Sequence, residues 1–119
     1  MYKRLLIIAD IEGSTGCADY EASSFNTSSW YDACIDMSLD INAVVTRLFE
    51  RGAVKIYIKD FHRTGFNLLP ELIDKRAHVI HGYKEGPVPG IGEIYDVEAV
   101  MFIGMHASSG SGGFLAHTL

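Results

Sequence analysis

Two carboxylates lie one residue apart, directly after the first apolar run of the chain. Asp10 and Glu12 follow the segment 5–9, whose composition is typical of a buried strand. Because alternate side chains of an extended backbone share a face, both carboxylates should point the same way. Their mutual repulsion is unfavourable unless a cation or a shared proton relieves it. Taken alone, the pair is also compatible with a polar strand end that bears two solvated acids.

Two further strand-like segments end in residues of the types that bind divalent cations. Asp60 and His62 follow the segment 53–58, and His106 follows the segment 97–103. The carboxyl ends of parallel strands meet at one edge of a sheet, so these side chains should converge with the first carboxylate pair. Carboxylate oxygens and imidazole nitrogens are ligands that zinc prefers. The pattern therefore predicts a metal site at that edge.

A long amphipathic helix should separate the first two strands. Ser29 is the expected N-cap, and Gly52 is the expected C′ residue. Between them apolar side chains recur at three- and four-residue steps: Cys34, Met37, Ile41, Val44, Val45 and Leu48. A strand, a long helix and a second strand favour parallel pairing with a right-handed crossover. The predicted fold class is α/β, a mainly parallel sheet flanked by helices with the site at the carboxyl edge of the strands.

The remaining segments are shorter. We expect a short helix over 70–75, a short strand over 77–81 and a loop rich in glycine and proline over 84–92. The two histidines of the short strand are interpreted as structural or exposed: His78 and His81. The segment 108–113 lacks the lysine and the glycine order of a phosphate-binding loop, and we interpret it as a mobile active-site loop.

Length, charge and cysteine content exclude several classes of protein. The 119 residues fit one domain, 1–119. A formal net charge of -5 without a basic run argues against nucleic acid as a partner. The longest apolar stretch is far too short to cross a membrane, and the N-terminus does not resemble a signal peptide. Cys17 and Cys34 lack metal-binding spacing, so we expect reduced thiols and a cytoplasmic location.

Four short motifs, in order along the chain, resemble the D-aminopeptidase family of zinc metallopeptidases, the type found with bacterial dipeptide-transport operons. The motifs are Asp10-Ile11-Glu12-Gly13, Asp60-Phe61-His62, Gly104-Met105-His106 and Ala116-His117-Thr118. Each motif is weak alone, but their order and spacing cover nearly the whole chain. The resemblance implies hydrolysis of short peptides at the N-terminus, with a preference for D-residues. It also implies two zinc ions per subunit and a homo-oligomer.

The resemblance further assigns a role to each metal-binding residue. Asp10 would be the carboxylate that bridges the two zinc ions. Glu12 and His62 would complete one metal site, and His106 would belong to the other. A bridging carboxylate is chemically reasonable, because it offsets the repulsion between two cations about 3.5–4 Å apart.

Two other residues receive roles beside the metal ligands. The resemblance makes His117 the catalytic histidine, acting as a nucleophile or as a proton carrier. Asp60 could orient a ligand from behind, as imidazole ligands generally require. A strand-end acid that caps the following turn is an equally good interpretation of Asp60.

One departure from the family pattern concerns length. Family members are about twice as long, and their second metal site takes a glutamate from downstream of the catalytic histidine. This sequence ends at Leu119, two residues after His117. We therefore interpret the chain as the truncated N-terminal part of a longer metallopeptidase. It should bind one zinc ion firmly and a second weakly, show little activity alone and tend to oligomerise.

Two alternatives remain. Residues 10–15 also resemble the first motif of haloacid-dehalogenase-type, magnesium-dependent phosphatases, in which the first aspartate is the nucleophile and the second is the general acid. Here Glu12 replaces that second aspartate, a late aspartate pair for magnesium is missing, and the histidines are left unexplained. The third possibility is a catalytically incomplete module for metal binding or assembly.

Overall fold

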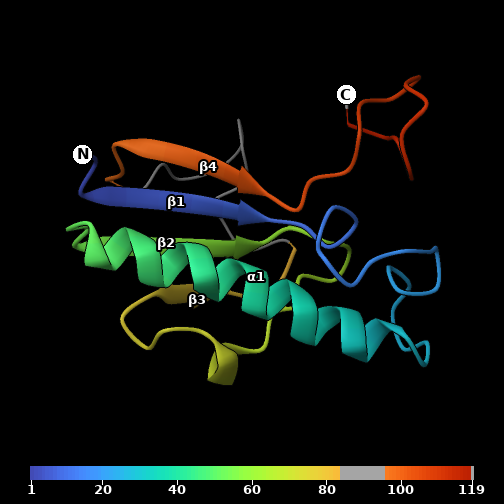
Figure 1. Ribbon diagram of the computed structural model, residues 1–119, viewed down its shortest axis with the longest axis horizontal. Helices are drawn as coiled ribbons and strands as arrows, with labels where there is room; N and C mark the ends of the chain where they lie inside the picture. Colours follow the sequence, from blue (N-terminus) through green and yellow to red (C-terminus); the bar gives the residue numbers. More distant parts are fainter. Residues whose placement is uncertain (84–95, 119) are drawn as a thin grey trace.

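The computed structural model describes residues 1–83 and 96–118 as a parallel four-stranded sheet with a long helix on one face (Figure 1). The strand order is β3-β2-β1-β4, and each neighbouring pair is parallel. The elements are β1 (Arg4–Ala9), α1 (Trp30–Glu50), β2 (Lys55–Asp60), the 3₁₀ helix η1 (Pro70–Leu72), β3 (His78–Ile80) and β4 (Ala99–Ile103). The predicted α/β class with a parallel sheet is confirmed. The loop expected over 84–92 lies outside the described residues.

β1 lies between β2 and β4 because its apolar residues suit burial on both faces. Leu5, Ile7 and Ala9 belong to the core cluster that includes the buried face of α1. Leu6 and Ile8 alternate with them and are also buried. A continuous apolar run of this kind is typical of a parallel strand covered on both sides. The first polar side chains after the run therefore emerge at the carboxyl edge of the sheet.

α1 begins after Ser29 and ends before Gly52, as expected, but its N-terminus is not capped by the Ser29 hydroxyl. Within the described part of the chain that hydroxyl makes no capping hydrogen bond, because Ser29 itself has helical backbone angles. Instead, Thr27 Oγ1 accepts a hydrogen bond from the Trp30 backbone N–H at 3.2 Å. Gly52 has a φ of +97°, which suits the C′ position. No helix among the described residues is long and apolar enough to span a membrane.

Several predicted boundaries shift by one to three residues. β2 begins at Lys55 and continues through Asp60, because Asp60 pairs with Ala9 of β1. Asp60 is therefore the last residue of the strand. The predicted helix over 70–75 is the single 3₁₀ turn η1, and the predicted strand over 77–81 shortens to β3.

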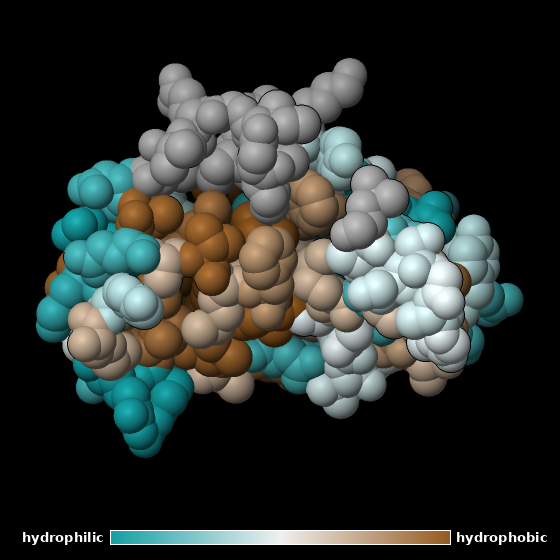
Figure 2. Space-filling view, turned by 90° about the horizontal axis from the view of Figure 1, so that it is seen from above, coloured by the Kyte–Doolittle hydropathy of each residue, from teal (hydrophilic) through white to brown (hydrophobic). Residues whose placement is uncertain are grey.

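β4 is the edge strand next to β1, and part of its surface is apolar. Val100 is 49% exposed and Phe102 is 55% exposed. Figure 2 shows apolar side chains gathered on the side of the molecule where β4 lies. The segment that follows β4 passes beyond the carboxyl ends of β1 and β4 and ends near them (Figure 1).

Two glycines allow the loops after β1 and β4 to touch. The Gly13 backbone N–H donates to the Gly104 carbonyl oxygen at 2.8 Å, and the Asp10 N–H donates to Ile103 at 2.9 Å. Gly104 has a φ of +71°, and a Cβ there would collide with the Asp10 carbonyl oxygen. A glycine at this position lets the β4 loop lie directly beside Asp10, so residues from both strand ends share one site.

Candidate metal centre

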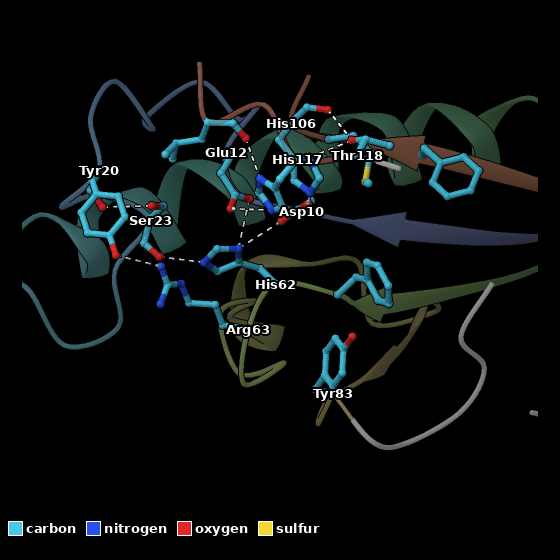
Figure 3. A pocket seen from close by; sticks show the side chains of 14 residues that line it. Asp10, Glu12, Tyr20, Ser23, His62, Arg63, Tyr83, His106, His117 and Thr118 are labelled. Atoms are coloured by element: carbon cyan, nitrogen blue, oxygen red, sulfur yellow. Dashed lines mark hydrogen bonds and ion pairs between the residues drawn. The ribbon is translucent and has the colours of Figure 1, made fainter. Parts of the chain in front are cut away.

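Three of the predicted metal ligands form a buried cluster at the carboxyl edge of the sheet. Ligand atoms of Asp10, Glu12 and His62 all lie within 4.8 Å of one another. His62 Nδ1 lies 3.1 Å from Asp10 Oδ1 and 3.0 Å from Glu12 Oε2. All three residues are buried, at 3%, 8% and 4% exposure respectively. Figure 3 shows the imidazole of His62 directed toward the two carboxylates.

Asp10 lies between two histidines. Its Oδ1 faces His62 Nδ1, and its Oδ2 lies 3.4 Å from His106 Nε2. The Ile11 backbone N–H donates to Oδ1 at 2.9 Å and fixes the orientation of the carboxylate. One oxygen thus faces each imidazole, which is the arrangement that a bridging carboxylate requires.

The backbone carbonyl of Ser23 determines which nitrogen of His62 faces the cluster. His62 Nε2 lies 2.7 Å from the Ser23 oxygen, and because a carbonyl oxygen only accepts, Nε2 carries a hydrogen. Nδ1 is then the nitrogen available to the two carboxylates. In its neutral form His62 would present the Nδ1 lone pair to a cation, with the opposite nitrogen oriented by a protein group as metal-bound histidines require.

A proton on His62 stabilises the cluster electrostatically. Burial opposes the charged form of His62, but the hydrogen bond to Asp10 and the close Glu12 carboxylate raise its pKa to about 9. Burial also opposes ionisation of Glu12, yet its contacts with His62 hold the pKa of that carboxyl at about 2. Burial raises the pKa of Asp10. A proton on His62 therefore relieves the repulsion that a cation would otherwise relieve.

The donor set fits a zinc ion. Glu12 Oε2 is buried and has no hydrogen-bond partner among the described residues. It lies 3.0 Å from His62 Nδ1, but the angles of this contact are not those of a hydrogen bond. A buried carboxylate oxygen without a hydrogen-bond partner destabilises the folded protein unless a cation or an ordered water molecule contacts it. Two carboxylates and one imidazole nitrogen match the mixed oxygen and nitrogen shells of zinc sites.

His117 lies at the opening of this cluster. Its ring stacks on that of His106, with centroids 3.3 Å apart and planes at 20°. His117 Nδ1 lies 2.5 Å from the Leu115 carbonyl oxygen and so carries a hydrogen, while Nε2 lies 3.9 Å from Glu12 Oε1. The ring is 58% exposed. A half-exposed imidazole whose second nitrogen faces the site is well placed to transfer protons.

Backbone hydrogen bonds between residues 107–109 and 117–118 bring His117 to the site. The His117 and Thr118 N–H groups both donate to the Ala107 carbonyl oxygen, at 3.0 Å and 3.1 Å, and the Ser109 N–H donates to Thr118 at 2.7 Å. The start of the segment 108–113 is therefore paired with residues 117 and 118.

Asp60 acts on the loop that bears His62. Its carboxylate accepts hydrogen bonds from the backbone N–H groups of Asn67 and Leu68, at 2.6 Å and 2.8 Å, and from Asn67 Nδ2 at 2.9 Å. Asn67 Nδ2 also donates to the His62 carbonyl oxygen at 2.7 Å. Asp60 therefore caps the turn that follows β2. Asp60 reaches His62 through Asn67, whose role no sequence pattern indicates.

The cluster opens into a cavity of about 850 Å³ with two different walls (Figure 3). On one side Arg63 contacts Tyr20, with Nη2 3.4 Å from the phenolic oxygen and the guanidinium 5.8 Å from the ring centroid. On the other side Phe61 stacks on Tyr83, with ring centroids 5.7 Å apart, and Phe102 of β4 also lines the cavity. Arg63 is the only lysine or arginine among the described residues that line the cavity.

The remaining two histidines of the sequence lie away from this cavity. His78 contacts the ring of Tyr57, with centroids 5.5 Å apart. His81 stacks on Phe66 at 5.4 Å, and its Nδ1 lies 3.2 Å from the Gly65 carbonyl oxygen. Both contacts are of the structural kind expected from the sequence.

Comparison with known proteins finds D-aminopeptidases both by sequence and by structure. A curated D-aminopeptidase from Bacillus subtilis (strain 168) is 22% identical over 118 residues, which are 98% of this chain and 42% of the relative. The solved structure of the zinc-dependent D-aminopeptidase DppA from Bacillus subtilis, described as a self-compartmentalizing protease, matches with a TM-score of 0.80 at 21% identity. That match covers 97% of this chain and 42% of the other, and it supports the fold. The chain thus spans less than half the length of these relatives. The family model for the D-aminopeptidases, Peptidase_M55, matches residues 3–119, and the chain therefore belongs to the D-aminopeptidase family.

Proposed function

We propose that the protein is a zinc-dependent aminopeptidase that removes N-terminal amino acids, with a preference for D-residues, from short peptides. The observation that carries this proposal is the Asp10 carboxylate, which directs one oxygen to His62 and the other to His106. Both relatives are D-aminopeptidases, and the solved one is described as zinc-dependent.

We also propose a cytoplasmic location, for which the sequence gives the only support.

We propose that the two zinc ions differ in affinity. Asp10, Glu12 and His62 would hold the first ion, and Asp10 with His106 would hold the second. The first ion would have three protein ligands, as is usual for catalytic zinc, whereas the second would share Asp10 and have one ligand of its own, His106, among the described residues. The first ion should therefore bind more tightly. When bound, zinc supplies a Lewis acid that polarises the scissile carbonyl and activates water.

The walls of the cavity suit a short peptide. Arg63 offers a guanidinium that can pair with the carboxylate at the end of a dipeptide, in the planar geometry that arginine favours. The aromatic wall of Phe61, Tyr83 and Phe102 offers apolar contacts to a side chain. His117, through Nε2, would carry the proton to the leaving amine.

A homo-oligomer is also part of the proposal. The relative DppA is described as self-compartmentalizing. Val100, Phe102 and Phe114 are exposed apolar residues on β4 and on the segment that follows it. Apolar side chains exposed in this way are typical of surfaces that associate.

The activity test uses the zinc-loaded chain with D-alanyl and L-alanyl p-nitroanilides and, in parallel, p-nitrophenyl phosphate with magnesium. Because the second zinc ion should bind weakly, we expect slow, zinc-dependent release of p-nitroaniline, faster for the D-isomer. Hydrolysis of the phosphate ester with magnesium would contradict the proposal and favour the phosphatase alternative. Firm zinc binding without turnover of any substrate would contradict the enzymatic proposal and favour the metal-binding module.

His117→Ala tests the proton-transfer role. We expect kcat to fall by about 100-fold or more with the zinc content unchanged, because the variant loses a general acid but no metal ligand. Steady-state kinetics and metal analysis of the same sample measure both quantities. His78→Ala, an exposed histidine on β3, is the matched control and should keep kcat. An unchanged kcat would remove His117 from the mechanism, and lost zinc would make it a ligand.

A further inference from the structure

The hydroxyl of Thr118 contacts His106 at two points. Thr118 Oγ1 lies 2.9 Å from the His106 carbonyl oxygen and 2.7 Å from His106 Nδ1. A hydroxyl has a single hydrogen, and a carbonyl oxygen can only accept. The hydrogen therefore goes to the carbonyl oxygen, since otherwise two acceptor oxygens would face each other. The hydroxyl oxygen is then the acceptor toward Nδ1.

This pairing fixes the tautomer of His106. If Thr118 accepts from Nδ1, then Nδ1 carries the hydrogen and Nε2 of the neutral ring has the lone pair. A second acceptor, the Ala107 carbonyl oxygen, lies 3.4 Å from the same Nδ1 and favours the same tautomer. Nε2 is the nitrogen that faces Asp10 Oδ2 at 3.4 Å. The lone pair is thus directed into the cluster, toward the place of a cation.

We propose that Thr118 is a positioning residue whose hydroxyl holds His106 as the Nδ1–H tautomer and presents Nε2 to the second divalent cation. This inference rests on the metal site of the proposed function and adds a determinant for it. His62 is oriented in the opposite sense, with Nε2–H on the Ser23 carbonyl oxygen and Nδ1 facing the carboxylates. The two histidines would therefore bind through different ring nitrogens, each selected by a neighbouring oxygen.

The position of Thr118 in the fold supports this role. Its N–H donates to the Ala107 carbonyl oxygen, and its own carbonyl oxygen accepts from Ser109. The hydroxyl is thus held beside His106 by backbone pairing on both sides of the residue. The same short pairing holds His117, so the histidine of one metal site and the proposed proton carrier share one support.

The first test reads the tautomer directly in the zinc-free protein. Nitrogen-15 NMR of the imidazole rings at a pH where His106 is neutral should show protonated Nδ1 and unprotonated Nε2. Thr118→Ser, which keeps the hydroxyl, should give the same pattern. Thr118→Val removes the hydroxyl at similar volume and should shift His106 toward the Nε2–H form. Backbone amide spectra that coincide outside the segment 106–118 would show that the variant is folded.

The second test is calorimetric titration with zinc. We expect Thr118→Val to weaken the second, weaker binding event by about 10- to 100-fold and to leave the first unchanged, since an orienting partner of a metal ligand typically contributes that much. Thr118→Ser and the remote control Thr46→Val on α1 should match the wild type.

Three outcomes would overturn the inference. They are an Nε2–H tautomer of neutral His106 in the wild type, an unchanged tautomer in Thr118→Val, or equal zinc affinity in the valine and serine variants. Because the NMR measurement needs neither zinc nor turnover, it distinguishes a failure of this inference from a failure of the proposed function.

Discussion

Asp10→Asn is expected to weaken binding of the first zinc ion by more than about 100-fold, because even orienting partners of metal ligands contribute 10- to 100-fold. The substitution keeps the shape of the side chain but removes its charge. It also replaces one carboxylate oxygen by an NH₂ group that must face either His62 or His106. A donor at that position repels a cation, so both proposed sites should be affected at once.

Calorimetry and thermal unfolding in the presence of zinc measure this effect. Zinc at 100 times its dissociation constant should stabilise the wild type by about 2.7 kcal/mol, and the variant should show almost none of this stabilisation. Asp32→Asn changes the same charge on the exposed first turn of α1 and is the matched control. Equal stabilisation of the wild type and Asp10→Asn by zinc would show that the ion binds elsewhere.

Asp60→Ala is expected to lower the free energy of unfolding by about 3 kcal/mol or more. Asp60 is fully buried, and its carboxylate accepts hydrogen bonds from three N–H groups of Asn67 and Leu68. Each buried donor left without a partner costs roughly 1–3 kcal/mol. A loss of this size is a large part of the about 5–15 kcal/mol by which domains are stable.

Urea unfolding followed by circular dichroism measures this loss. Glu71→Ala, an exposed acid in the neighbouring turn η1, is the control and should change stability by less than about 0.5 kcal/mol. A loss below about 1 kcal/mol for Asp60→Ala would mean that the loop 61–68 keeps its conformation without the carboxylate. In that case Asp60 would not be the residue that positions His62 through Asn67.

Residue type and spacing were sufficient to predict that Asp10, Glu12 and His62 lie together, with His106 beside Asp10. Asp10 and His106 follow apolar runs that can only be buried strands, and parallel strands bring their carboxyl ends to one edge. The alternation of side chains on an extended backbone placed Asp10 and Glu12 on the same side. These inferences depend on local pattern and on sheet topology, which a single sequence expresses well.

No sequence pattern indicates the groups that orient the metal ligands. The Ser23 carbonyl oxygen is a backbone atom in a long loop, and Asn67 lies in an irregular segment seven residues after Asp60. Which ring nitrogen of a histidine faces a metal depends on contacts between loops that are distant in sequence. Ser29 occupies the predicted N-cap position, but its hydroxyl does not cap α1, because the conformation of Ser29 follows from the turn that precedes the helix.

Anomalous X-ray scattering at the zinc absorption edge tests the central claim most directly, because it locates the ion without reference to activity. The account predicts the strongest peak between Asp10, Glu12 and His62, at about 2.0–2.2 Å from carboxylate oxygens and from Nδ1 of His62. It predicts a weaker peak between Asp10 and Nε2 of His106. The strongest peak on His78 or His81, with His62 Nδ1 still in direct contact with both carboxylates, would contradict the account.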